Sequence, residues 1–388
     1  MFSARTEWNL APNRFTEAQR ELQASGTAIL DLTISNPTAA GVHYDAKAIS
    51  GALNNPAAMV YDPQPLGLRS AREAVAAYYR DGHTLELDPD SILLTTSTSE
   101  GYSYIFRLLC NPGDEILVPK PSYPLFEFLA DLEDVTLIPY PLIYDHGWQV
   151  DFLSLQKSVR PNTRGVVVVH PNNPTGSYVS AQEQAELNNF CRANDLALIV
   201  DEVFLDYALD GTPRQTFAAN QDVLTFTLSG ISKISGLPQM KLSWIATSGP
   251  PGQVNPAMAR LEVIADTYLS MNAPIQLAAP VMLEQRRRIQ PALVERIRQN
   301  LSELDGQLAM QKSCTRLAVD GGWYAVLRVP VTQSDEDLAI EILRKTHVLV
   351  HPGHFYDFSS DGYLVLSLIT PSARFREGIV RMLRLIGR

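Results

Sequence analysis

The sequence predicts an α/β protein, with a mostly parallel seven-stranded sheet in a large domain and a smaller α/β domain after it. Short runs of aliphatic and β-branched residues alternate with longer helical patterns, which is typical of consecutive βαβ units. Two runs, 166–169 and 197–200, are apolar at every position, as expected of central strands that are covered on both faces. After residue 275 long charged helical patterns follow, and they indicate the second unit.

The expected elements can be placed in chain order. The strands of the large sheet are expected at 91–96, 115–119, 135–139, 165–170, 197–201, 223–228 and 242–247. Those of the smaller unit are expected at 323–329, 348–350 and 363–368. A crossover helix is expected over 180–193, and a long helical pattern over 281–310 contains Pro291, where we expect a kink. We therefore expect an N-terminal arm with part of the small domain in 1–45, a large domain in 46–275 and a small C-terminal domain in 276–388.

Length, charge and cysteine content exclude several classes of protein. A chain of 388 residues with 45% hydrophobic content can bury a large core and exceeds the usual size of one compact unit. The net charge of -10 argues against a nucleic-acid or anionic-membrane surface, which needs a basic face. Three widely spaced cysteines offer neither a disulfide framework nor a Cys-x-x-Cys metal motif. We therefore expect no metal site. Because no signal-peptide pattern and no apolar run of about 20 residues occurs, we expect a cytoplasmic protein.

The segment from Leu228 to Lys241 contains the first candidate catalytic residue. It places Lys233 among small residues and hydroxyls, between an apolar run and a glycine turn. A lysine amine is nucleophilic only when deprotonated, and desolvation beside another cation lowers its pKa enough for Schiff-base chemistry. Lys241, eight residues later, is a candidate for that second cation. The alternative is that both lysines are solvated loop residues.

Polar residues also follow three other expected strands, at the edge where ligands bind in open α/β sheets. Thr98 and Ser99 open a helix whose free N–H groups suit a phosphate, although a plain N-cap is the alternative. Asn173 lies in a proline-rich turn that holds its amide still. Asp201 ends a buried strand, where an unpaired carboxylate is costly. We expect a cationic partner for Asp201, from the protein or a ligand, unless it is an ordinary helix cap.

Together the residues at these strand ends indicate one kind of ligand. A phosphate cradle, a fixed amide, a buried carboxylate and a nucleophilic lysine suit a phosphorylated aldehyde with a ring nitrogen that can be protonated. Pyridoxal phosphate is that molecule. The sequence therefore predicts pyridoxal 5'-phosphate as the cofactor.

Over nearly its whole length the chain resembles the class I/II aminotransferases, which are pyridoxal-phosphate enzymes of fold type I in the aspartate aminotransferase superfamily. The resemblance implies that Lys233 forms a Schiff base with the cofactor and then moves the proton of the substrate's α-carbon. It implies that Asp201 pairs with the ring nitrogen of the cofactor and that Asn173, in an Asn-Pro-Thr-Gly turn, binds its phenolic oxygen. The phosphate would be bound by Thr98, Ser99, Ser232 and Lys241.

The same resemblance places further residues near the cofactor. Tyr123, in Pro-Ser-Tyr-Pro, falls where the family has an aromatic ring stacked on the cofactor; packing in a turn is the alternative. Tyr61 matches a tyrosine that reaches the phosphate of the neighbouring subunit, so the resemblance implies a homodimer with active sites at the interface. Tyr268, Ser270 and Asn272 fall on the loop that approaches the cofactor from the partner subunit.

Three positions depart from the family's pattern. Lys241 stands where the family has a phosphate-binding arginine, and a lysine cannot form a bidentate fork. Phe204 replaces a tyrosine that would donate to the phenolic oxygen. Val365 replaces the arginine that binds the substrate's α-carboxylate, and such a charge-assisted pair contributes on the order of 2 to 3 kcal/mol. Either another cation binds the carboxylate or the substrate has none at this place.

Several residues near Val365 have open roles. Arg374 and Arg376 are either cations for the carboxylate or solvated residues in the first turn of the last helix. His351, His354 and Tyr356, in a loop that resembles the family's substrate mouth, either contact substrate or pack against the protein.

These observations lead to a first hypothesis and two alternatives. The first is an aminotransferase that moves an amino group from an α-amino acid to a 2-oxo acid by a ping-pong mechanism through the Lys233 Schiff base. The second is a β-lyase or decarboxylase on the same scaffold, which Val365 favours. The third is a regulatory or binding module with a vestigial site, which would require Lys233 or Asp201 to be missing, and both are present.

Overall fold

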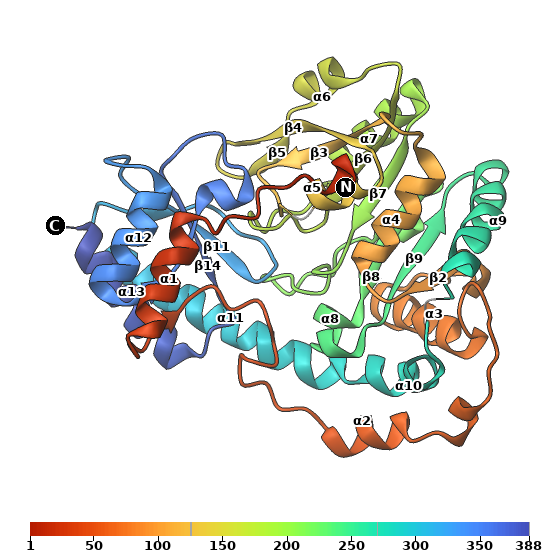
Figure 1. Ribbon diagram of the computed structural model, residues 1–388, viewed down its shortest axis with the longest axis horizontal. Helices are drawn as coiled ribbons and strands as arrows, with labels where there is room; N and C mark the ends of the chain where they lie inside the picture. Colours follow the sequence, from red (N-terminus) through yellow and green to blue (C-terminus); the bar gives the residue numbers. More distant parts are fainter. Residues whose placement is uncertain (125, 270, 388) are drawn as a thin grey trace.

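The protein is described here from a computed structural model, in which residues 1–124, 126–269 and 271–387 are described. Its largest element is an eight-stranded sheet in the order β2-β9-β8-β7-β6-β3-β4-β5 (Figure 1). Strand β9 is antiparallel to both neighbours and β5 is antiparallel to β4, while the other neighbours are parallel. In chain order the strands are Ile92–Thr95 (β2), Glu115–Lys120 (β3), Thr136–Tyr144 (β4), Trp148–Val150 (β5), Thr163–Val169 (β6), Ala197–Asp201 (β7), Thr225–Gly230 (β8) and Ser243–Ser248 (β9).

All seven strands expected for the large sheet are present, but the predicted number of strands was one too low. The eighth strand, β5, pairs with the extended end of β4 and forms a hairpin at the sheet edge. Its three residues alternate between half-buried and exposed, so they form no apolar run that would have marked a strand. The central strand β6 is buried at six of its seven positions and half-buried at Arg164, which confirms the interpretation of its apolar run.

Helices cover both faces of the large sheet (Figure 1). One apolar cluster joins the sheet to α4 (Thr98–Leu109), α5 (Phe126–Leu132) and α9 (Pro251–Tyr268). Clusters on the opposite face contain residues of α3 (Arg69–His83), α10 (Ala273–Glu284), α6 (Phe152–Ser158) and α7 (Ala181–Asn194). Helix α7 is the expected crossover helix, and a capping box between Ser180 and Glu183 fixes its start.

A second, antiparallel sheet has the order β10-β11-β14-β13. Its strands are Thr315–Arg316 (β10), Tyr324–Arg328 (β11), His351–Pro352 (β13) and Tyr363–Ser367 (β14). The helices beside it are α1 (Arg14–Ala24), α11 (Arg286–Ala309), α12 (Asp335–Thr346) and α13 (Ser372–Ile386). These elements share one apolar cluster, which also includes Phe204 and Tyr207 from the loop after β7. The small sheet is therefore packed directly against the carboxyl edge of the large one.

The N-terminal segment joins the unit of the small sheet. Strand β1 (Leu30–Asp31) pairs in parallel with β12 (Val348–Leu349), and the Ser367 N–H donates to the Leu32 carbonyl at 2.7 Å. The chain then passes Ser35 and reaches α2 (Ala46–Leu53), which lies beside α10 (Figure 1). The remaining short helices are Ala4–Thr6 (η1), Pro56–Met59 (η2), Pro89–Ser91 (η3), Phe217–Ala219 (η4), Ile231–Ile234 (α8), Pro238–Met240 (η5) and Gly353–Tyr356 (η6).

The long charged helical pattern is interrupted earlier than expected. The break falls at Gln285, between α10 and α11, and Pro291 lies inside α11. At the break the Gln285 side chain donates to the Val281 carbonyl at 3.3 Å and the Arg286 guanidinium donates to the Leu283 carbonyl at 3.1 Å. These side chains satisfy carbonyls that the end of a helix leaves unpaired. In the part of the chain that the structure describes, no helix combines the length and the apolar character needed to cross a membrane.

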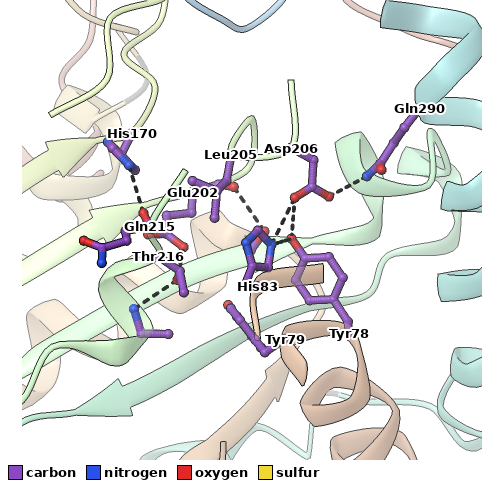
Figure 2. A network of polar contacts seen from close by, with 12 residues as sticks. Tyr78, Tyr79, His83, His170, Glu202, Leu205, Asp206, Gln215, Thr216 and Gln290 are labelled. Carbon is purple, nitrogen blue, oxygen red and sulfur yellow. Dashed lines mark hydrogen bonds and ion pairs between the residues drawn. The ribbon is translucent and has the colours of Figure 1, made fainter. Parts of the chain in front are cut away.

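A buried polar cluster lies behind the end of β7 (Figure 2). The Asp206 carboxylate accepts a hydrogen bond from the Tyr78 hydroxyl at 3.0 Å and pairs with His83 Nε2 at 3.1 Å. Its other oxygen accepts from the Gln290 amide. Burial alone would lower the pKa of His83, but Asp206, the Glu202 charge and a backbone hydrogen bond of Arg214 together raise it. One carboxylate thus connects α3, the loop after β7 and α11.

Glu202 belongs to the same region and is almost fully buried. Its two oxygens accept from the Thr216 hydroxyl and the Phe217 N–H, both at 2.6 Å (Figure 2). Burial raises the pKa of Glu202 to about 7 because the charged form loses its hydration. The folded protein therefore binds this proton at pH values where the unfolded chain has released it.

We expect the Glu202→Gln variant to gain stability relative to the wild type as the pH rises from about 5 to about 8. Between the ordinary pKa of 4.5 and the folded value of about 7 the folded wild type binds more protons, so its free energy of unfolding falls with rising pH. The amide carries no charge, so the difference should grow by up to about 3 kcal/mol. Urea unfolding at both pH values measures it, with Glu86→Gln as an exposed control. An equal difference at both pH values would contradict the assignment.

Candidate active site

Lys233 and Asp201 lie at the carboxyl ends of neighbouring parallel strands. Asp201 is the last residue of β7 and is paired with Leu228 of β8, while Lys233 follows the end of β8 in the one-turn helix α8. Burial lowers the pKa of Lys233 to about 8, and the Asp201 charge opposes this shift. Burial raises the pKa of Asp201 to about 6, and Lys233 opposes that shift in turn. Each charge therefore acts on the other through space, although no direct ion pair between Lys233 and Asp201 occurs among the described residues.

The two oxygens of Asp201 have hydrogen-bond donors. The Val203 N–H donates to Oδ1 at 3.1 Å, and the Tyr102 hydroxyl donates to Oδ2 at 3.3 Å. Both bonds favour the ionised carboxylate. The sequence analysis did not identify Tyr102. Tyr102 could have been found from its distance of four residues from Thr98 in the same helix, since residues four apart share a helix face.

Four groups contact Lys233, three at its Nζ and one at its backbone carbonyl. The Ser35 carbonyl accepts from Nζ at 3.2 Å, and the rings of Trp323 and Phe204 have their centroids 4.8 and 5.5 Å from Nζ. The Tyr207 hydroxyl donates to the Lys233 carbonyl at 2.7 Å. The sequence analysis did not propose these contacts, because the four residues come from three segments far apart in the chain.

The residues expected to bind phosphate lie at the same sheet edge. Ser243 of β9 is paired with Thr95 on one side and with Gly230 on the other, so the ends of β2 and β8 and the start of β9 form one row. The segments just beyond this row contain Thr98, Ser99, Ser232 and Lys241. The N-cap of α4 is Ser97, whose hydroxyl accepts from the Glu100 N–H at 3.1 Å, so Thr98 and Ser99 occupy the first turn. Lys241 is exposed, with a left-handed backbone (φ 55°).

Asn173 and Tyr123 follow two further strands of the same edge. Asn173 comes after β6 and is buried, and its Oδ1 has no hydrogen-bond partner among the described residues. Tyr123 follows β3 and is 44% exposed. Burial raises the pKa of Tyr123, and the Asp201 carboxylate adds to this shift, so the phenol lies within electrostatic reach of Asp201. The structure thus brings both residues to the edge where the predicted site lies.

The residues expected to act across a subunit interface are not part of this cluster. Tyr61 is 76% exposed on the segment between η2 and α3. Tyr268 is also exposed, and Asn272 is the N-cap of α10, where its Oδ1 accepts from the Ile275 N–H at 3.1 Å. Ser270 lies outside the described residues.

Val365 lies in β14 and is buried between Val326 of β11 and His351 of β13. His351 Nδ1 is 3.0 Å from the Tyr356 hydroxyl, and burial lowers the pKa of this histidine to about 4. It is therefore neutral at physiological pH. The place of the expected arginine is occupied by apolar and neutral groups.

The other candidate residues near the C-terminus lie at the surface. Arg374 and His354 are exposed, and Arg376 is exposed and paired with Glu303 of α11 at 2.8 Å. The structure shows Arg376 in a surface ion pair, which agrees with its interpretation as a solvated residue of the first turn.

The sequence profile described as "Aminotransferase class I and II" matches residues 27–373. The chain belongs to the class I and II aminotransferase family. The glutamate-pyruvate aminotransferase AlaA of Haemophilus influenzae is 26% identical to this aminotransferase over 374 residues, covering 94% of this chain and 92% of the relative. An alanine aminotransferase of Mycobacterium bovis is 27% identical over 378 residues, covering 93% and 86%.

Solved structures show the same fold. The alanine aminotransferase of Pyrococcus furiosus superposes with a TM-score of 0.90 at 21% sequence identity, covering 100% of this chain and 99% of that one. The aspartate aminotransferase of Thermus thermophilus gives 0.84 at 20% identity, with 99% of each chain covered. These comparisons confirm the predicted fold class and the prediction of an aminotransferase. They give no support to a β-lyase, a decarboxylase or a regulatory module.

Removing the Tyr102 hydroxyl should raise the pKa of Asp201. In the Tyr102→Phe variant the carboxylate loses one donor, and a hydrogen bond to a charged group contributes about 1.5 kcal/mol, so we expect a rise from about 6 toward about 7. The ¹³Cγ shift of Asp201, followed with pH in the cofactor-free protein, measures it. Tyr140→Phe is the matched control, because it removes a buried hydroxyl that bonds Val167 instead. A rise of the same size in both variants would exclude a specific effect of Tyr102.

Proposed function

We propose that this aminotransferase binds pyridoxal phosphate covalently through Lys233 and moves an amino group from an α-amino acid to a 2-oxo acid. The observation that supports this best is the position of Lys233 and Asp201 at the ends of two neighbouring buried strands. Burial holds the pKa of Lys233 at about 8, so a useful fraction of Nζ is an unprotonated amine near neutral pH. Bound pyridoxal phosphate supplies an aldehyde that takes up the amino group and a ring that accepts electrons from the substrate's α-carbon.

The described residues fit this cofactor. Asp201 would hold a proton on the ring nitrogen, because burial disfavours its charge and no cation contacts its carboxylate directly among the described residues. The Asn173 amide has a buried oxygen without a partner, and the assignment of oxygen and nitrogen in an amide can be exchanged, so one end of it would bind the phenolic oxygen. Tyr123 would cover one ring face. The phosphate would be held by Thr98, Ser99, Ser232 and Lys241.

Lys233 would also move the proton that the reaction transfers. Once its Nζ is released, it would take a proton from the α-carbon of the substrate and return it to the cofactor. A lysine with a pKa of about 8 suits both directions, because its two protonation states are close in free energy near neutral pH.

The two relatives named above are called alanine and glutamate-pyruvate aminotransferases, and these names support a small α-amino acid as donor and a 2-oxo acid as acceptor. Val365 supplies no positive charge from β14, so the carboxylate of that substrate would be bound by neutral hydrogen-bond donors or by a cation from another segment.

Adding a panel of amino acids to the purified, cofactor-loaded protein should test the reaction. The true donor is expected to remove the visible absorption band of the bound cofactor and to yield its 2-oxo acid. Lys233→Ala should show neither the band nor turnover, a loss of at least about a thousandfold, because the covalent link and the proton carrier are both gone. Lys157→Ala, which changes an exposed lysine, should behave as the wild type. Ammonia or carbon dioxide as product, or turnover by Lys233→Ala, would contradict the proposal.

We also propose a homodimer with Tyr61 acting in the partner's site. Exposed apolar side chains gather on two neighbouring segments, and the hollow between 58–65 and the residues 265–269 and 271–276 has a volume of about 350 Å³. Such a patch is typical of an interface. Its most exposed large residues are Met59, Val60, Tyr61, Tyr268 and Leu269.

A mixed dimer distinguishes action across the interface from action within one chain. Tyr61→Ala and Lys233→Ala subunits are each expected to be nearly inactive as homodimers. A mixed dimer of the two should regain activity, because one of its sites combines an intact Lys233 with the intact Tyr61 of the other chain. Lack of recovery in verified mixed dimers would exclude a role for Tyr61 across the interface.

A further inference from the structure

The ammonium of Lys233 lies in a cradle made by three separate segments of the chain. Ser35, just beyond β1, offers its carbonyl oxygen at 3.2 Å. Trp323, just before β11, presents its ring 4.8 Å from Nζ, and Phe204, after β7, presents its ring at 5.5 Å. Trp323 is fully buried and Phe204 is 4% exposed. The two rings of the cradle therefore belong to the core, whereas Ser35 lies at the surface.

The aromatic part of the cradle is packed as a unit. The Trp323 ring meets the Phe204 ring edge-to-face at 5.2 Å, and it meets the Tyr207 ring at 5.2 Å in the same way. The Tyr207 hydroxyl in turn binds the Lys233 carbonyl at 2.7 Å. Trp323 thus contacts the Nζ of Lys233, and Tyr207, packed against Trp323, binds the backbone carbonyl of the same residue.

The ring contacts favour one protonation state of the lysine. A positive charge within about 6 Å of a ring centroid is attracted by the electron-rich face, most strongly by tryptophan, and the attraction is larger where water is excluded. A neutral amine gains almost none of this energy, although it still donates to Ser35. Burial and the rings therefore act in opposite directions on Lys233: burial disfavours the ammonium, and the rings stabilise it.

We propose that Trp323 and Phe204 are positioning residues that hold the free ammonium of Lys233 whenever this lysine is not covalently engaged. The holding site keeps Nζ beside Asp201 and retains the proton that Lys233 carries during turnover. It joins one ring from the unit of the large sheet to one ring from the unit of the small sheet. The position of the unbound Lys233 side chain would therefore depend on both the large-sheet unit and the small-sheet unit.

This inference rests on the role proposed for Lys233, but its test uses the full-length, cofactor-free protein. Competitive labelling of lysines with acetic anhydride over a range of pH, read by mass spectrometry of the Lys233 peptide, gives the pKa of this one amine. Failure of the amino-acid panel would overturn the proposed function and leave this titration interpretable.

In Trp323→Met the ring is lost while a flexible side chain refills the space. We expect the pKa of Lys233 to fall from about 8 toward about 7. The unprotonated fraction at about pH 7, and with it the labelling rate, should rise roughly fivefold. Trp323→Phe, which keeps a weaker ring, should fall between the variant and the wild type. Phe204→Leu should lower the pKa by a smaller amount, because its ring is farther from Nζ.

Trp244→Phe is the matched control, because Trp244 is an equally buried tryptophan that bonds Tyr79 in another cluster. It should lower thermal stability without changing the titration of Lys233. An unchanged pKa in folded Trp323→Met and Phe204→Leu would overturn the proposal. A higher pKa in Trp323→Met would also overturn it, because exclusion of water, and not the ring face, would then be the main effect of Trp323.

Discussion

The structure depends on two opposite charges that lie at the ends of β7 and β8, where burial weakens the hydration of both. An isolated carboxylate or ammonium at either place would lose its hydration without compensation. The parallel register of the strands places Asp201 beside Leu228, and the turn after Gly230 returns Lys233 toward the carboxylate. The shifts in the two pKa values have the same origin: burial acts against both charges, and each charge partly restores the other.

The layer around this pair is built from segments that are distant in the chain. The pairing of β1 with β12 directs the N-terminal segment past Lys233, so Ser35 reaches Nζ. The loop after β7 contributes Phe204, and the residue before β11 contributes Trp323. Since these side chains share one apolar cluster with the small sheet, the geometry at Lys233 depends on how the two sheets pack against each other.

Two of the positions that depart from the family's pattern, Phe204 and Val365, carry apolar side chains. Phe204 has no hydroxyl and packs its ring against Trp323. Val365 is buried between two strands, and the nearby His351 is neutral because burial lowers its pKa to about 4. Apolar contacts and neutral hydrogen bonds therefore replace two polar interactions. Under the proposed function, a substrate carboxylate would find no bidentate fork on β14 and would depend on neutral donors or on a cation from another segment.

The sequence by itself determined the order of strands and helices, because each buried strand of a parallel sheet must be apolar along its length and therefore stands out. It also identified Lys233, Asp201 and Asn173, since residues just past successive strands must meet at one edge. It could not locate the hairpin strand β5 or the helix break at Gln285, which depend on half-exposed residues and on side chains that satisfy carbonyls. Only the tertiary structure brought Ser35, Tyr102, Tyr207 and Trp323 to the site. Contacts between residues as far as 198 positions apart leave no local pattern, and they arise from the packing of one sheet on the other.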